Sequence, residues 1–273
     1  MIKTVSIIIP VFNEGATITE LLDAVLNQPL PSGLKKELVL VESNSTDGSR
    51  AKVETFYRRL LTDAPSDASV QIILQEAPRG KGFAVRAGLE RATGQIILIQ
   101  DADLEYDVSD YPALLQPILD GHADFVLGSR HLSAGHWKIR KFEKNPLTAA
   151  IMNFGGGFFH WLFNVVYRTR LTDPTTMYKV FLSECIRGVN FESNRFDFDW
   201  ELVAKLVRLG YTPLEVPVSY RSRSFDEGKK INFYRDPFTY INAIFKFRLK
   251  RITRTPRAAR STSEITQGNL TNL

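Results

Sequence analysis

Short apolar runs alternate with longer amphipathic segments through the first half of the chain. The apolar runs predict strands at Val5–Ile9, Glu37–Val41, Val70–Leu74, Ile96–Ile99 and Phe125–Leu127. Between them, apolar residues recur with helical spacing, which predicts helices over Ala16–Asn27, Gly48–Leu61, Gly82–Ala92 and Asp110–Leu119. Several of the strands are apolar on both faces. The pattern therefore predicts an α/β fold, in which helices cover both faces of a mostly parallel sheet.

The second half of the chain predicts fewer strands. We expect a helix over Arg195–Leu209, a strand over Thr212–Val218 and a helix over Pro237–Arg251. Residues 261–273 are polar and lack periodicity, which predicts a disordered tail. The domain organisation that we expect is one main domain over residues 1–236, an amphipathic basic helix over 237–260, and the tail.

One uncharged segment, Leu147–Tyr167, is long enough to cross a bilayer if His160 is neutral. It contains three consecutive glycines, Gly155–Gly157, and it lies between two segments that are expected to build one site on one side of a membrane. We therefore predict a buried or membrane-surface helix pair within residues 145–168 rather than a spanning helix. Its aromatic residues face either lipid or the protein core: Phe158, Phe159, Trp161 and Phe163.

The net charge of +5 is unevenly distributed. Residues 246–260 contain seven basic residues and no acidic one, so this run accounts for more than the whole excess. It is either a solvated tail or a surface for anionic lipid or nucleic acid. Cys185 is the only cysteine, which excludes an intramolecular disulfide and fits a reducing compartment. The residues around Met1 do not have the pattern of a signal peptide, so we expect a cytoplasmic protein.

Polar, acidic segments follow three of the predicted strands. They are Pro10–Glu14, Glu42–Ser49 and Asp101–Glu105. Ligands of open α/β sheets bind beyond the carboxyl ends of the strands, so these segments are expected to form the site. Asp101 and Asp103 flank a single alanine, and Glu105 follows. Carboxylates in this arrangement are suited to Mg²⁺ or Mn²⁺, which stabilises a departing nucleoside diphosphate.

The chain resembles glycosyltransferase family 2, whose members have the GT-A fold. The resemblance covers residues 4–236, and its motifs occur in the expected order: VSIIIPVFNE (5–14), VESNSTDGS (41–49), GKGFAVRAGL (80–89), DADLEYD (101–107), GSR (128–130), LTDPTTMYKVF (171–181), FDFDWE (196–201) and EGKKI (227–231). Within the family it is most similar to the dolichyl-phosphate mannose or glucose synthases and their bacterial polyprenyl-phosphate relatives. The resemblance implies that residues 1–236 are the catalytic domain.

The resemblance also implies roles for individual residues. The donor would contact Pro10, Phe12, Glu14, Glu42, Asp47, Lys81, Arg86, Asp101 and Asp103. The metal group would be Asp101, Asp103 and Glu105. Phosphates of the donor or acceptor would contact Arg130, Lys179, Arg221, Arg223, Lys229 and Lys230. Glu42 replaces the aspartate usual in the family. Asp47 and Lys179 also have plainer interpretations, as a residue of a helix start and as the end of a strand.

The expected reaction is an in-line displacement at the anomeric carbon that inverts it. Asp103 would act through the metal. A lipid phosphate is already an anion and needs no strong base, whereas a sugar hydroxyl needs one, for which Glu201 and Asp199 are the candidates. We favour transfer of a hexosyl group from a donor of the GDP-mannose or UDP-glucose type to polyprenyl or dolichyl phosphate. The enzyme would then be peripheral at the cytoplasmic face of an anionic membrane, with a membrane-protein partner or self-association left open.

Other functions remain open at this point. A family 2 enzyme could instead glycosylate a glycan hydroxyl. A sugar nucleotidyltransferase would also combine such a sheet with metal-binding aspartates, but PVFNEGA after the first strand is not its glycine-rich, arginine-containing loop. No motif for nucleic-acid recognition accompanies the basic run. The four histidines show no metal-ligand spacing and are assigned no role.

Overall fold

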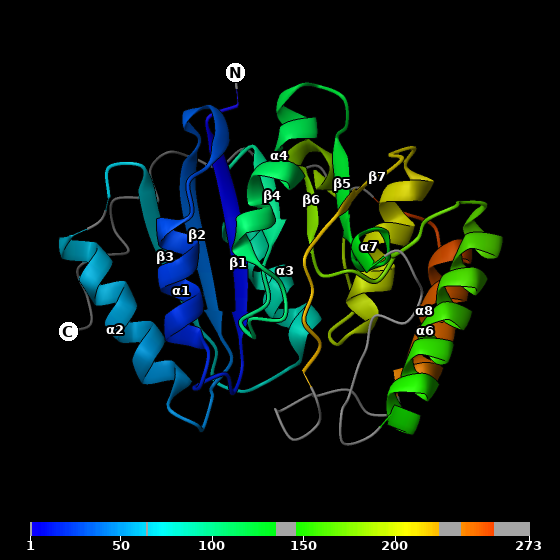
Figure 1. Cartoon of the computed structure of the whole chain (residues 1–273), viewed down its shortest axis with the longest axis horizontal. Coiled ribbons are helices and arrows are strands. Elements are labelled where there is room, and N and C mark those ends of the chain that lie inside the picture. Colours follow the sequence, from blue (N-terminus) through cyan, green and yellow to red (C-terminus); the bar gives the residue numbers. More distant parts are fainter. Residues whose placement is uncertain (1, 64, 135–145, 224–235, 254–273) are drawn as a thin grey trace.

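A seven-stranded mixed sheet forms the centre of the molecule. The computed structural model describes residues 2–63, 65–134, 146–223 and 236–253. The strand order is β3-β2-β1-β4-β6-β5-β7. The strands are β1 (Thr4–Val11), β2 (Lys35–Glu42), β3 (Ala68–Leu74), β4 (Ile96–Ile99), β5 (Phe125–Ser129), β6 (Lys179–Leu182) and β7 (Leu214–Pro217). The predicted α/β class is confirmed, and Figure 1 shows the twisted sheet with helices around it.

The first four strands are parallel to one another, and β6 runs antiparallel to both β4 and β5. The carboxyl ends of β1, β2 and β4 therefore lie at one edge of the sheet, at the bottom of Figure 1. This confirms the expectation that the segments after these strands meet. Strand β6 was not among the predicted strands, although one interpretation of Lys179 placed it at the end of a strand.

Helices lie on both faces of the sheet. They are α1 (Ile18–Asn27), α2 (Ser49–Thr62), α3 (Lys81–Arg91), α4 (Tyr111–Leu119), α5 (Arg130–Ala134), α6 (Pro146–Tyr167), α7 (Asp197–Arg208) and α8 (Asp236–Leu249), with 3₁₀ turns at Pro31–Gly33, Val108–Asp110 and Ser183–Ile186. Figure 1 shows α1 in front of the first strands and α3 behind them. Gly88 permits the close packing of α3, because a Cβ there would lie 2.5 Å from Ile8 Cγ2.

The uncharged segment forms one continuous helix, α6, so the predicted helix pair is wrong. Its glycines do not break it. A Cβ on Gly155 or Gly157 would meet no neighbouring atom, so no turn depends on them. Packing holds the helix instead: Phe163 and Tyr167 are buried, and the two rings stack with centroids 4.3 Å apart. Of the helices that the structure describes, none combines the length and apolar character needed to cross a membrane.

Hydrogen bonds join the segments that follow β1 and β2. Asp47 Oδ2 accepts from the backbone N–H of Gly15 at 2.7 Å, and Ser45 Oγ accepts from that of Asn13 at 2.9 Å. Asp47 also accepts from the Ser49 N–H at the start of α2, at 3.1 Å. These contacts set the shape of the β1 side of the carboxyl edge.

Candidate active site

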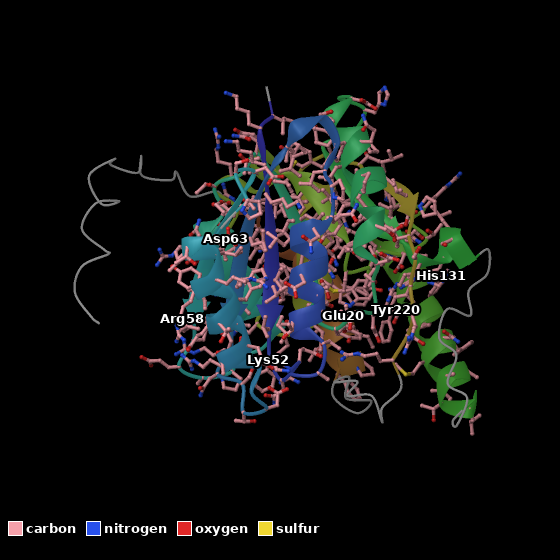
Figure 2. All side chains as sticks on the ribbon, turned by 60° about the vertical axis from the view of Figure 1, so that its left-hand side comes forward. Glu20, Lys52, Arg58, Asp63, His131 and Tyr220 are labelled. Carbon is pink, nitrogen blue, oxygen red and sulfur yellow. The ribbon has the colours of Figure 1, made fainter. Side chains whose placement is uncertain are left out.

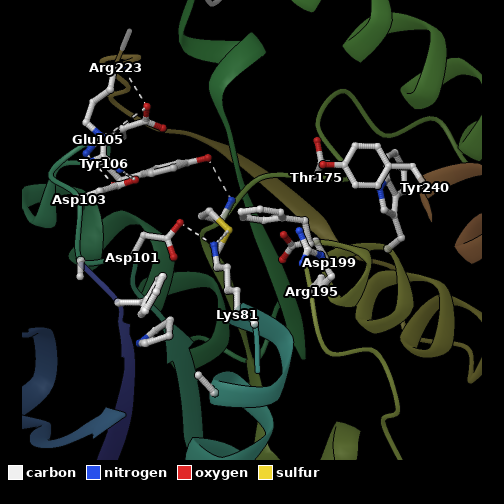
Figure 3. A pocket seen from close by; sticks show the side chains of 18 of the residues that line it. Lys81, Asp101, Asp103, Glu105, Tyr106, Thr175, Arg195, Asp199, Arg223 and Tyr240 are labelled. Atoms are coloured by element: carbon white, nitrogen blue, oxygen red, sulfur yellow. Dashed lines mark hydrogen bonds and ion pairs between the residues drawn. The ribbon is translucent and has the colours of Figure 1, made fainter. Parts of the chain in front are cut away.

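A cleft of about 760 Å³ opens at the carboxyl edge of the sheet. One part of its wall comes from the segments after β1 and β4 and from the start of α3. The other part comes from α6, α7 and α8. The predicted site residues that line it are Pro10, Phe12, Glu14, Lys81, Asp101, Asp103, Glu105, Arg130, Asp199 and Arg223. Figure 3 shows Asp101, Asp103 and Glu105 at one end of the cleft, Asp199 between the ends, and Tyr240 at the other end.

Asp101 and Asp103 lie in the cleft, and each faces a different cation. Asp101 Oδ2 lies 2.6 Å from Lys81 Nζ, and Asp103 Oδ2 lies 2.8 Å from Arg223 Nη2 (Figure 3). Burial and the nearby Asp101 and Glu105 charges raise the pKa of Asp103 to about 7. Burial also raises the pKa of Asp101, although Lys81 opposes the shift. Lys81 and Arg223 thus leave part of the negative charge of these carboxylates uncompensated.

Uncompensated carboxylates fit a divalent cation. Mg²⁺ is commonly held by one or two carboxylates together with phosphates of a substrate. Asp101 and Asp103 are suited to that mode. Glu105 is less available, because its Oε1 accepts from the Arg223 backbone N–H at 2.7 Å and its Oε2 from Tyr220 Oη at 3.0 Å. The predicted metal group is therefore better described as two aspartates, with Glu105 holding the segment that contains Arg223.

Asp199 and Glu201 have separate positions, as expected for residues two apart near a helix start. Asp199 lines the cleft and lies 2.9 Å from Lys179 Nζ. Glu201 is fully buried and accepts from the backbone N–H groups of Glu192 and Ser193 and from Lys205 Nζ. The hypothesis that Glu201 is a catalytic base does not fit these contacts, because its oxygens hold the segment before α7.

Lys179 does not line the cleft but lies beneath it. Its side chain is fully buried and donates to Asp199 and to the backbone carbonyl of Thr176. Burial lowers the pKa of Lys179, and Asp199 opposes the shift. A phosphate contact through Lys179 does not fit this position. Its place in the structure indicates that it orients the Asp199 carboxylate.

Four other predicted residues lie outside the cleft. Glu42 is buried and accepts from the N–H groups of Asn44 and Ser45. Asp47 has the contacts of a helix-start residue, described above. Arg86 donates to Asn194 Oδ1 at 3.0 Å, and Arg221 donates its backbone N–H to the Glu105 carbonyl. Hydrogen bonds occupy the carboxylates of Glu42 and Asp47, whereas the predicted contacts of Arg86 and Arg221 with donor or phosphate stay predictions. Lys229 and Lys230 lie outside the described residues.

Arg130 lines the cleft but is committed to a buried ion pair. Its Nε and Nη2 lie 2.6 and 2.7 Å from the two oxygens of Asp173, and both side chains are nearly inaccessible. Although burial opposes the effect, the guanidinium holds the pKa of Asp173 well below its usual range. The charge of Arg130 is therefore largely neutralised by Asp173, and its main contribution is to the structure of the cleft wall.

Two histidines join this pair, which sequence spacing did not indicate. Potential ligand atoms of His131, His160 and Asp173 lie within 4.8 Å of one another. The spacing of the histidines in the sequence did not predict this cluster, because the three residues come from α5, α6 and the segment before β6, which meet only in the folded structure. Asp173 already accepts three hydrogen bonds from Arg130, so a cation would have to displace the guanidinium. The cluster is better described as support for the cleft wall.

Two arginines in the cleft were missed by the sequence analysis. Arg79 and Arg195 both line it. Arg79 lies over the ring of Phe83, and Arg195 precedes α7. Among the described residues, the Arg195 Nε is buried and has no hydrogen-bond acceptor. The only signal in the sequence was position: each arginine directly borders a family motif, GKGFAVRAGL or FDFDWE.

Comparisons with known proteins agree with this geometry. The family model of Glycosyl transferase family 2 matches residues 6–195. A dolichol-phosphate mannosyltransferase of Pyrococcus furiosus is 26% identical over 243 residues, which are 89% of this chain. This chain spans only 63% of the length of that relative. An undecaprenyl-phosphate mannosyltransferase of Micrococcus luteus is 27% identical over 81% of this chain, and the match covers 85% of that relative's length.

Solved structures show the same fold. A glucosyl-3-phosphoglycerate synthase from Mycobacterium tuberculosis, in complex with Mg²⁺ and UDP, has a TM-score of 0.60 at 18% identity, over 90% of this chain and 79% of that one. A mannosyltransferase from Pyrobaculum calidifontis, in complex with GDP-Man and Mn²⁺, has a TM-score of 0.50 at 20% identity. The match covers 78% of this chain and 54% of that one. Both are GT-A proteins. The match to the family model covers well over half of the residues, so this chain belongs to glycosyl transferase family 2.

Proposed function

We propose that this protein transfers a hexosyl group from a nucleoside diphosphate sugar to a polyprenyl phosphate, with inversion and with help from Mg²⁺ or Mn²⁺. The observation that carries the proposal is a cleft with two chemically different ends. Asp101, Asp103 and Lys81 lie toward one end, whereas Tyr240, whose ring contacts that of Phe159, lies toward the other (Figure 3). A charged diphosphate suits the first end and a prenyl chain suits the second. The two curated mannosyltransferase relatives support the same acceptor class.

The metal would be held by Asp101 and Asp103, and it supplies positive charge that stabilises the departing diphosphate. The chain's own cations act around the same point. Lys81 is buried against Asp101, and despite the opposing effect of burial the carboxylates raise its pKa, so it stays protonated. Arg79 and Arg195 offer further positive charge to phosphate oxygens. This preorganised charge lowers the barrier without reorganisation during the reaction.

Asp199 is the remaining carboxylate that could face the acceptor. With a phosphate as nucleophile, the chain needs only to position an existing anion, and Asp199 would do so through the cations around it. With a sugar hydroxyl as nucleophile, Asp199 would accept the proton. A glycan hydroxyl is thus the second candidate acceptor, and the position of Asp199 in the cleft is the observation that favours it.

The test uses radiolabelled GDP-mannose and UDP-glucose, each with Mn²⁺ and with polyprenyl phosphate in detergent. We expect label to enter the organic phase with one donor, together with release of the nucleoside diphosphate. Label that stays in the aqueous phase on a glycan would support the second acceptor. Release of pyrophosphate would instead indicate a sugar nucleotidyltransferase. An Asp103→Asn variant that keeps full activity would contradict the metal role in either case.

A further inference from the structure

Helix α6 exposes a continuous apolar stripe. Six of its residues are 44–74% exposed, and each follows the previous one by three or four positions: Leu147, Ile151, Phe154, Phe158, Trp161 and Val165. Their spacing places them on one side of the helix. Buried Phe163 and Tyr167 occupy the opposite side and belong to the main hydrophobic core. The helix has no Asp, Glu, Lys or Arg, so nothing on the exposed side carries a fixed charge.

Helix α8 lies beside α6 and exposes a second stripe. Its exposed apolar residues are Phe238, Ile241, Phe245 and Leu249. Tyr167 Oη donates to the Ile244 carbonyl at 2.8 Å, and the rings of Phe159 and Tyr240 are 5.5 Å apart, so the helices are in direct contact (Figure 1). We name these ten exposed residues the α6–α8 face.

Helices α1 and α2 expose charged side chains instead. Figure 2 shows Glu20 on α1 and Lys52 and Arg58 on α2 among charged side chains that point outward. Globular proteins seldom expose a large apolar patch unless it binds something. The exposed apolar residues of the α6–α8 face are therefore suited to binding a partner, and the surrounding residues indicate its chemistry.

Basic residues gather at one end of the face. Arg168 and Arg170 follow α6 directly, and Lys246, Arg248, Lys250 and Arg251 lie in the last turn of α8 or just after it. The two helices run in the same direction, since Phe159 contacts Tyr240 and Val166 accepts from Arg248, so both sets lie at neighbouring helix ends. Glu192 pairs with Lys246 and Lys250, which leaves more positive than negative charge.

The face also adjoins the cleft. Ile151 belongs to the exposed stripe and lines the cleft as well. Gly155, Gly156 and Phe159 of α6 line the cleft from the same helix, together with Tyr240 of α8. Within the part of the chain that the structure describes, uncharged residues of α6 thus lead from the face to the apolar end of the cleft.

We propose that the α6–α8 face docks onto a lipid bilayer that contains anionic lipids, with α6 and α8 lying along the surface and the cleft opening beside them. The proposal rests on the proposed function, since a polyprenyl phosphate is held in a bilayer. Apolar stripes enter the acyl boundary while basic residues meet lipid phosphates. A second copy of this chain is a poorer complement, because it would present the same positive charge to the basic end.

The test measures co-sedimentation with vesicles of phosphatidylcholine alone and of phosphatidylcholine mixed with phosphatidylglycerol, without any acceptor. We expect binding that increases with the anionic lipid. Replacing Phe154, Trp161 and Phe245 together by Ser should weaken binding about tenfold or more, because bound apolar area sets the affinity. Replacing Arg170 and Arg251 by Gln should remove mainly the preference for phosphatidylglycerol. The matched control replaces two exposed leucines on other elements, Leu61→Ser and Leu214→Ser, and should bind like the wild type.

Two outcomes would overturn the proposal. One is a wild type that does not bind either vesicle. The other is a wild-type dimer in solution that the triple serine variant converts to monomer, since the face would then join two copies of the chain. Transfer to polyprenyl phosphate in detergent is measured separately with the same variants. Vesicle binding without any transfer would contradict the proposed function but support the docking surface. Transfer in detergent without vesicle binding would support the proposed function but contradict the docking surface.

Discussion

Arg223 Nη2 lies 2.8 Å from Asp103 Oδ2, although 120 positions separate the two residues in the chain. The same guanidinium donates to both oxygens of Glu14, at 2.8 and 3.2 Å. Arg223 therefore joins the segment after β1 to the segment after β4. Its guanidinium also provides positive charge at the point where a metal would bind. Arg223 and a metal ion would therefore compete for the Asp103 carboxylate.

This competition predicts an unusual effect of Arg223→Gln. Without the guanidinium, Asp103 and Glu14 are less compensated, and the affinity for Mn²⁺ in the absence of nucleotide should rise, by roughly tenfold. Calorimetric titration with Mn²⁺ measures it. Arg58→Gln, an exposed position on α2, is the control for the loss of one positive charge. An affinity that falls in Arg223→Gln would mean that Arg223 supports the metal site instead of competing with it.

Asp199 and Glu201 should behave differently when each loses its charge. Asp199→Asn is expected to reduce turnover by roughly 10²-fold or more, because Asp199 lines the cleft, and also to lower the free energy of unfolding, because the buried Lys179 loses its carboxylate partner. Glu201→Gln is expected mainly to lower the free energy of unfolding, since its buried carboxylate holds Glu192, Ser193 and Lys205. Steady-state kinetics and urea denaturation of both variants separate the two roles. A large loss of turnover in Glu201→Gln without a loss of stability would instead support a catalytic role for Glu201.

Arg195 should contribute to phosphate binding, whereas Arg86 should not. Arg195→Ala is expected to raise the KM for donor or acceptor by about tenfold, because Arg195 lines the cleft in which we propose that the phosphates bind. Arg86→Ala removes the same side chain from a position outside the cleft, where it contacts Asn194, and should change KM little. Equal KM values for the two variants would argue against a role for Arg195.

The Arg130–Asp173 pair should stabilise the fold in a way that depends on pH. Asp173→Asn leaves a buried guanidinium without its carboxylate and is expected to cost about 3–5 kcal/mol of unfolding free energy. The pKa of Asp173 is depressed in the folded state, so this stabilisation is present above the unfolded pKa and is lost as the pH falls toward the folded one.

Urea denaturation of wild type and Asp173→Asn at neutral pH and at successively lower pH measures this dependence. The difference between the two proteins should shrink as the solution becomes acidic below the ordinary range of an aspartate. A difference that stays constant would assign the cost to lost packing and hydrogen bonds rather than to ionisation.

Local patterns were enough to predict the β1–β4 part of the sheet, because long apolar strands between amphipathic helices have few alternative arrangements. Asp101 and Asp103 could be assigned for the same reason: they directly follow a predicted strand at the edge where ligands bind. The segment containing Glu14 was also found, since parallel strands bring their carboxyl ends together, whereas Lys81 came only from the resemblance to the family.

Side-chain direction could not be obtained in this way. Glu42 and Glu201 have the right chemistry for a site, but their oxygens point to backbone N–H groups, which depends on how loops fold back. The grouping of His131, His160 and Asp173 comes from three segments with no common spacing. The outward stripe of α6 likewise required its neighbours: an uncharged helix has no polar side to mark the surface, and only packing against α7 and α8 shows which residues remain exposed.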